Sequence, residues 1–221
     1  MNIEKINETK HICISTNSDS FAYASTIYTY ILTLHKKVSI VSSDVVVEKF
    51  AFLPWFDKVR RVVPSSVELI IESDFKTQEL YDFFVINKIK INKKMAIALY
   101  TTLLLENKNF QNIDDNGIVF AQAKELIELG AEHRKCHKYL YNRTGLNILR
   151  LKSILFKNFI LKRSATEVEV TICDDELQAV GAKISDVYPL LEEFFTLVNV
   201  NEVTLIKSDE ENKILINLKE K

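Results

Sequence analysis

The stretch HICISTNSDSFAYAS, residues 11–25, decides the fold of this chain. Its first part, residues 11–16, is a short apolar run that predicts a buried β-strand. From Asp19 to His35 the apolar and aromatic residues recur at helical spacing, and Ser18 or Asp19 is a suitable N-cap. A strand that feeds a helix in this way predicts the opening unit of an α/β fold.

The sequence on both sides of this unit predicts three parts. Further strand patterns lie in the first 74 residues, at 38–44, 58–63 and 67–72. Helix-period patterns dominate residues 75–157, where Asp114 and Asp115 suit a helix start and Gly130 suits a helix end. Strand patterns then return at 159–163, 168–173, 203–207 and 213–218, with helices at 174–180 and 184–199. We therefore predict an α/β fold with a shortened parallel-sheet lobe, a helical connector and a small second α/β lobe, over residues 1–110, 111–158 and 159–221.

Composition excludes several classes of protein. The charges nearly cancel, with 29 Lys+Arg against 30 Asp+Glu, which argues against a general nucleic-acid coat but leaves room for a local basic pocket. Cys13, Cys136 and Cys173 are widely spaced, which favours neither a disulfide framework nor a zinc ribbon. The polar N-terminus has no signal-peptide order and no apolar run approaches the ~20 residues of a membrane span. We expect a cytoplasmic protein that is not bound to a membrane.

The turn at residues 14–25 is the segment with a possible chemical message. A strand that leads into a helix places backbone N–H groups at the sheet edge where phosphate or metal chemistry is often found, and Asp19 would lie there. Taken alone, Asp19 is better explained as a helix cap.

This turn resembles the first motif of the DHH phosphoesterases, particularly the branch of bacterial oligoribonucleases and phosphoadenosine-phosphate phosphatases. That motif reads approximately His-x-x-Pro-Asp-x-Asp-Ala-x-Gly-Ser, and its His and two Asp bind manganese. With Ser25 as the final serine, the three ligand positions fall on Ser15, Asp19 and Phe21. The resemblance therefore implies that one metal ligand of three is kept.

Further segments resemble the same family in the same order. They are FLPWFDKV at 52–59, VELIIESD at 67–74 and INKKMAIALYTTLLLENKNF at 91–110, followed by ELIELGAEH and RLKSILF. The long helix at 91–110 implies that Glu106 stands where the family has a ligand Asp, and the preceding strand implies another ligand at Glu72 or Asp74.

The departures from the family are large. The Asp-His-His triplet that defines it occurs nowhere in the sequence, and the final strand has Lys219 at the position of a substrate-gripping Arg. The chain stops at Lys221, before the glycine-rich phosphate loop of the family. Two-metal hydrolysis needs carboxylates and imidazoles that offset about four positive charges. The resemblance thus implies a dismantled site without a cofactor, or at most a weakly held Mg²⁺ or Mn²⁺ on Asp19 and Glu106.

Two other groups of residues have alternative interpretations. His133, Cys136 and His137 have the spacing of a helical zinc site, but the general-base Glu is missing and a solvated helix is favoured. The resemblance implies an anion-binding groove for nucleotide or short RNA, with Arg143, Arg150 and Lys219 as candidates, although ordinary solvated helix faces are the favoured explanation of the two arginines.

Aromatic residues crowd two segments of the first lobe. They are Phe50, Phe52, Trp55, Phe56, Tyr81, Phe83 and Phe84. A shortened lobe would leave part of them uncovered, which predicts a homodimer or a protein partner, unless helices close over the gap. Three functions follow, namely a non-catalytic binding or scaffold protein, a residual metal-dependent phosphoesterase acting on short oligonucleotides or small nucleotides, and a nucleic-acid binder.

Overall fold

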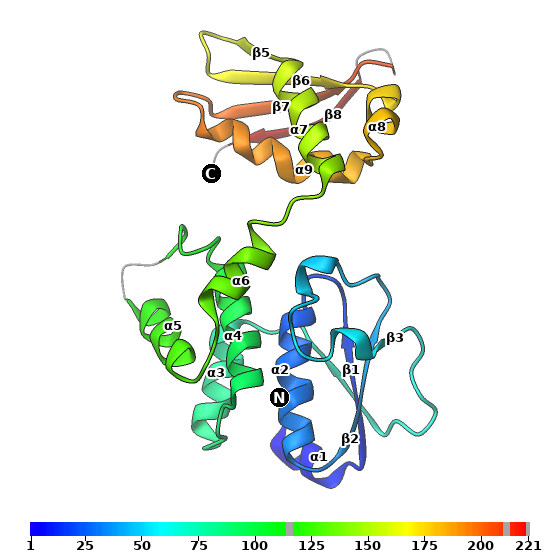
Figure 1. Cartoon of the computed structure of the whole chain (residues 1–221), viewed down its shortest axis with the longest axis vertical. Helices are drawn as coiled ribbons and strands as arrows, with labels where there is room; N and C mark the ends of the chain where they lie inside the picture. The colour runs from blue at the N-terminus through cyan, green and yellow to red at the C-terminus, as the bar shows by residue number, and fades with distance from the viewer. Residues whose placement is uncertain (114–116, 210–212, 220–221) are drawn as a thin grey trace. The chain divides into compact units, whose positions relative to one another are not determined.

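A computed structural model describes residues 1–113, 117–209 and 213–219, so Asp114 and Asp115 lie outside the described residues (Figure 1). The chain divides into two compact units, Met1–Arg143 and Thr144–Lys221. Each unit has its own apolar core.

The first unit begins with an α/β layer and ends in helices. Its elements in chain order are α1 (Ile3–Glu8), β1 (His11–Thr16), α2 (Phe21–Thr33), β2 (Lys37–Ser42), η1 (Glu48–Phe50), η2 (Phe56–Lys58), β3 (Val59–Arg60), β4 (Leu69–Glu72), α3 (Thr77–Ile86), α4 (Lys93–Glu106), α5 (Ile118–Glu128) and α6 (His133–Leu140). The described strands form a parallel sheet in the order β3-β2-β1-β4. The α/β fold with a parallel sheet is therefore confirmed.

Strand β1, formed by residues 11–16, is a central strand of this sheet. Ile12 and Ile14 of β1 are fully buried, and β1 pairs on one side with β2 and on the other with β4. The helix that follows begins later than expected, because Ser20 rather than Ser18 or Asp19 is the residue before its first turn, and the Ser20 side chain makes no cap hydrogen bond. Instead, Asn17 Oδ1 accepts the backbone N–H groups of Asp19 and Ser20, both at 2.9 Å.

The crowded aromatic residues lie mainly inside the first unit. Phe50 and Phe84 are fully buried, Phe52 and Tyr81 are 8% exposed, and Trp55, Phe56 and Phe83 are half-buried. Helices α2 and α4 pack against each other within this unit. Because most of these rings are buried or half-buried in the unit, the aromatic residues alone give no argument for or against a partner.

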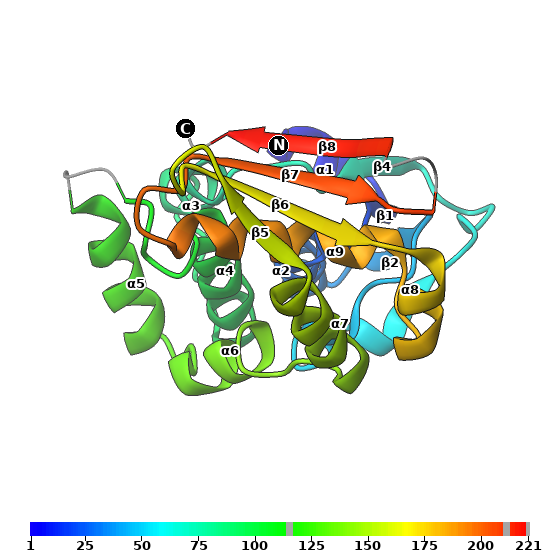
Figure 2. The same cartoon turned by 90° about the horizontal axis from the view of Figure 1, so that it is seen from above.

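The second unit is a four-stranded sheet, among the described residues, with helices on one face. Its elements are α7 (Leu146–Lys157), β5 (Phe159–Lys162), β6 (Glu167–Ile172), α8 (Asp174–Val180), α9 (Ile184–Leu191), η3 (Glu192–Thr196), β7 (Glu202–Lys207) and β8 (Lys213–Lys219). The strands lie in the order β5-β6-β7-β8, and the central pair is parallel while both outer pairs are antiparallel (Figure 2).

The segment predicted as a connector is shared between the units. Helices α5 and α6 pack on α4 of the first unit, whereas Leu151 and Leu155 of α7 are fully buried in the core of the second. The boundary therefore follows Arg143 rather than residues 110 and 158, because each helix joins the core that covers its apolar face. At the end of α5, Gly130 has a φ of 102°, as expected for a glycine that ends a helix.

None of the helices in the described part of the chain is both long enough and apolar enough to cross a membrane.

Candidate functional site

The carboxyl edge of the first sheet holds the residues that the sequence singled out. Ser15 is half-buried in β1, and its carbonyl oxygen accepts the backbone N–H of Ser73 at 2.9 Å. Asp19 is exposed in the turn after β1. Phe21 is fully buried, and its ring contacts those of Phe50 and Phe56 at centroid distances of 6.0 and 5.8 Å. Phe21 therefore belongs to the core and offers no atom to a metal.

A cluster of hydroxyl groups joins the ends of β1 and β4 at this edge. Ser20 Oγ lies 2.7 Å from the hydroxyl of Ser73 and 3.0 Å from that of Thr16. It also donates to Asn17 Oδ1 at 3.0 Å. We call Thr16, Asn17, Ser20 and Ser73 the hydroxyl cluster. All four side chains are neutral, and their polar atoms bind one another, so the cluster offers no negative charge to a cation.

Glu106, the carboxylate at the end of α4, is held by two donors. Its Oε1 accepts the phenol of Tyr23 from α2 and, at 2.9 Å, the backbone N–H of Thr77 in the first turn of α3. The hydroxyl of Thr77 donates in turn to that of Thr102 at 2.8 Å. A carboxylate at a helix N-terminus is stabilised by the helix dipole and by the unpaired N–H groups there. Glu106 therefore connects three helices.

The pKa of the Tyr23 phenol is changed by these surroundings. Burial raises its pKa above the usual range, and the hydrogen bond to Glu106 raises the pKa further. Both effects favour the protonated phenol, which is the form that donates to Glu106.

Glu72 and Asp74 lie at and after the end of β4, and both are exposed. They line a shallow pocket of about 330 Å³ together with Asn2 and Phe75. Within the described ranges, no group of three or more His, Cys, Asp or Glu residues is arranged to hold a metal ion. The residues at this edge therefore do not fit a two-metal centre.

The possible zinc site on α6 has its three side chains in different surroundings. Cys136 is fully buried, and burial raises the pKa of its thiol to about 11. His133 Nδ1 lies 2.8 Å from the Tyr100 phenol oxygen, while His137 contacts Asn142. The cysteine thus faces the core, and the histidines bind other side chains.

The candidate anion-binding residues belong to different units. Arg143, in the first unit, lies over the Tyr139 ring at 4.2 Å from its centroid. Arg150 on α7 and Lys219 on β8 are exposed and belong to the second unit. Neither unit by itself brings the three together.

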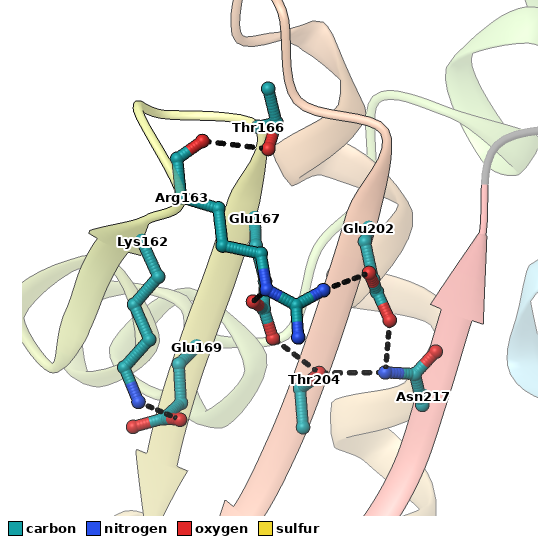
Figure 3. Close-up of polar contacts among 8 residues, drawn as sticks. All are labelled: Lys162, Arg163, Thr166, Glu167, Glu169, Glu202, Thr204 and Asn217. Carbon is teal, nitrogen blue, oxygen red and sulfur yellow. Dashed lines mark hydrogen bonds and ion pairs between the residues drawn. The ribbon is translucent and has the colours of Figure 1, made fainter.

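The second sheet carries a polar layer formed by charged and polar side chains from all four of its strands and from the turn after β5 (Figure 3). Arg163 contacts Glu167 at 3.2 Å and Glu202 at 3.3 Å, and Lys162 pairs with Glu169. Asn217 of β8 donates to Glu202 at 2.8 Å. The cations of this layer are paired with carboxylates, so it is not a basic surface for phosphate groups.

Sequence reasoning missed two features. It did not identify Tyr23 and Thr77 as partners of Glu106, which lie 83 and 29 residues away along the chain. It also missed an apolar pocket of about 550 Å³ between α4, α5 and α6. The exposed Phe120, the one aromatic residue of α5, was the available signal for the pocket.

Comparisons with known proteins add evidence on the fold. No protein-family model and no curated protein matches the chain. Among solved structures, an exopolyphosphatase-related protein from Bacteroides fragilis has a TM-score of 0.77 at 12% identity, covering 95% of this chain and 79% of that protein. A Methanococcus jannaschii protein named as a family II inorganic pyrophosphatase has a TM-score of 0.33 at 11% identity, over 89% of this chain and 83% of that one. The second score is too low to carry an argument. The chain therefore shares the fold of the exopolyphosphatase-related protein.

Proposed function

We propose that this chain is a non-catalytic relative of the phosphoesterases that acts as a cytoplasmic binding or scaffold protein through a homodimer or a protein partner. The hydrogen bonding of Glu106 is the observation that carries the proposal. The carboxylate that the sequence resemblance aligns with a metal ligand is instead bound to Tyr23 and Thr77. The hydroxyl cluster beside the same turn is neutral.

The energetic cost of restoring a metal supports this proposal. If Glu106 Oε1 turned to a cation, the N–H of the buried Thr77 would lose its acceptor, and the Tyr23 phenol would keep only its 3.5 Å contact with the Thr77 hydroxyl. Leaving a buried donor unsatisfied costs about 1–3 kcal/mol. The resemblance aligns Phe21 with a second ligand carboxylate, and the fully buried ring of Phe21 offers no ligand atom there.

A scaffold role needs a surface for a partner, and α7 offers one. Leu146, Leu149 and Phe156 are 61%, 57% and 39% exposed, although all three are large and apolar. Leu149 lies three residues after Leu146 and Phe156 lies ten residues after it, and at about 3.6 residues per turn all three fall on one side of the helix. Large apolar side chains exposed on one side of a helix are a feature of interaction sites.

The alternative is a residual phosphoesterase that acts on short oligonucleotides or small nucleotides with one weakly held cation. Asp19 follows β1 and Asp74 follows β4, which are neighbouring parallel strands, and both carboxylates are exposed. This is the observation that favours it.

A turnover assay separates the two functions. Metal-free protein is incubated with Mn²⁺ and labelled dinucleotides, beside Asp19→Ala and, as a matched control, Asp57→Ala, whose side chain is exposed in η2. We expect no hydrolysis above the blank in all three proteins. Hydrolysis that persists in Asp57→Ala and disappears in Asp19→Ala would establish the residual enzyme.

Sedimentation tests the interface. We expect the chain to self-associate or to retain a partner, and Leu149→Glu on α7 to abolish this association. Val198→Glu is the control, because Val198 is 83% exposed in the same unit but outside α7. A clean monomer that captures no partner, or an equal effect of both substitutions, would contradict the role proposed for α7.

A further inference from the structure

The apolar pocket of the first unit lies away from the hydroxyl cluster and has no part in the proposed function. Its volume is about 550 Å³, within the ~300–1,000 Å³ range of small-molecule sites. Tyr100 of α4 and Phe110, from the loop after that helix, line it together with Phe120 and Ile127 of α5. Phe120 is 56% exposed and Ile127 44% exposed, so water reaches much apolar surface here.

The walls of the pocket are aromatic rings. Phe110 and Phe120 are stacked, with centroids 5.5 Å apart and planes at 26°. The ring of Tyr100 lies 6.4 Å from that of Phe110. Offset stacking on such rings adds about 0.5–1.5 kcal/mol beyond area burial, which favours a planar ring over an aliphatic chain.

The loop that carries Phe110 fixes this arrangement in advance. Lys108, Asn109 and Phe110 have φ angles of 43°, 58° and 65°, a left-handed run that no glycine relieves. Such a conformation costs of order 1–2 kcal/mol per residue and persists only where the surroundings impose it. Hydrogen bonds from Asn109 N to Leu104 O and from Asn112 N to Asn107 O, at 2.8 and 3.2 Å, close the loop. A ligand therefore meets a preformed wall and pays little for ordering it.

Two side chains that carry nitrogen donors, those of His133 and Lys124, also line the pocket. His133 Nδ1 is engaged with the Tyr100 phenol, whereas the hydrogen bonds among described residues leave its Nε2 without a partner. Lys124 Nζ lies 3.6 Å from Glu128, but both side chains are more than 60% exposed, so this ion pair is weak. Glu128 offsets the charge of Lys124, so the lining has no net positive charge for a polyphosphate, and N–H donors on His133 and Lys124 suit a group with one negative charge.

We propose that this pocket binds a small planar aromatic molecule with one anionic group. The ring lies against Phe110 and Phe120, and the carboxylate or sulfonate is bound by His133 Nε2 and Lys124. The inference rests on the pocket alone and stands whether or not the sheet edge retains a metal.

The test uses 1-anilinonaphthalene-8-sulfonate, an aromatic monoanion whose fluorescence rises on binding, titrated into the full chain. We expect saturation at one equivalent. Phe120→Leu, which keeps an apolar side chain but removes the ring, and Lys124→Glu, which reverses one charge, should each weaken binding at least tenfold. Ile86→Ala, a change at a 76% exposed apolar residue of α3, should leave the affinity unchanged.

Urea unfolding of each variant establishes that it is folded under the conditions of the titration. Binding of several equivalents without saturation would overturn the proposal, as would equal affinities of Phe120→Leu and Ile86→Ala. A concentration-dependent dimer that Phe120→Leu dissociates would also overturn it, because the pocket would then be an interface between copies.

Discussion

The phenol of Tyr23 donates a hydrogen bond to the same Glu106 oxygen that accepts the Thr77 backbone N–H. One carboxylate thereby joins α2, α3 and α4 in the first unit. In the sequence, the one feature that draws attention to Glu106 is that the family resemblance aligns it with a metal-binding Asp. In the structure it is a component of helix packing, and the following predictions test that role.

Tyr23→Phe should lower the free energy of unfolding by about 0.5–1.5 kcal/mol, because Glu106, which is exposed, loses one of its two donors while the Tyr23 ring stays half-buried. Urea unfolding followed by circular dichroism measures the change. Tyr28→Phe is the matched control on the same helix, since no hydrogen bond of its hydroxyl occurs among the described residues. Equal losses in the two variants would assign the effect to the helix rather than to Glu106.

A double-mutant cycle isolates the pair itself. Glu106→Gln keeps an oxygen for Thr77 but removes the charge, and the cycle with Tyr23→Phe should give a coupling energy of about 0.5–3 kcal/mol. Additive losses, with no coupling, would mean that the phenol and the carboxylate do not interact in solution.

Stability should decline at alkaline pH more steeply than in variants that lack the buried phenols. Burial raises the pKa of Tyr100 to about 12 and also raises those of Tyr23 and Tyr81. The unfolded chain therefore loses protons near pH 10 while the folded chain keeps them, so stability present below pH 10 is lost as the pH rises toward 12. Tyr81→Phe should flatten this decline in urea midpoints, and Tyr188→Phe, at a 38% exposed tyrosine, should not.

His35→Gly should raise the free energy of unfolding by about 0.5–1 kcal/mol. His35 comes directly after Leu34, the C-cap residue of α2, and has a φ of 56°; its backbone N–H donates to the carbonyl of Leu32 at 3.0 Å. Glycine adopts this conformation without strain, whereas His35→Val should be destabilising because its side chain is branched at Cβ. Thermal and urea midpoints measure both, and a loss on introducing glycine would contradict the left-handed geometry.

The two cores should respond separately to mutation. Leu205→Ala opens a cavity in the fully buried core of the second unit and should cost about 2–5 kcal/mol there. Amide hydrogen exchange should then accelerate in β6 and β7 while β1 and α2 of the first unit keep their protection. Equal acceleration in all four elements would show that the chain unfolds as one cooperative body.

The strand-to-helix core of the first unit could be predicted from sequence because burial and period agree there. Ile12 and Ile14 belong to a short apolar run, which predicts a buried strand, and both residues are fully buried in the structure. Two details could not be predicted. Helix α1 has only Ile6 in the core, so its apolar period is too short to detect, and β3 shrinks to Val59–Arg60 because it is an edge strand paired on one side.

The candidate site was less predictable, since it depends on contacts between residues far apart in the chain. Sequence resemblance placed Asp19 and Glu106 at ligand positions, and the roles of these residues as ligands stay untested. The hydrogen-bond partners of these residues could not be predicted from the sequence. The packing of α2 on α4, which places Tyr23 beside Glu106, depends on the whole core. Asn17 likewise has no special signal until its side chain is seen to accept the N–H groups of the turn.

Titration of the metal-free chain with Mn²⁺, with the free ion followed by electron paramagnetic resonance, tests most directly whether the residues aligned with metal ligands bind a metal. The hydrogen-bonded Glu106 and the neutral hydroxyl cluster predict no saturable binding below millimolar Mn²⁺, and equal behaviour of wild type and Asp19→Ala. Two equivalents bound at micromolar concentration, and lost in both Asp19→Ala and Glu106→Gln, would contradict it.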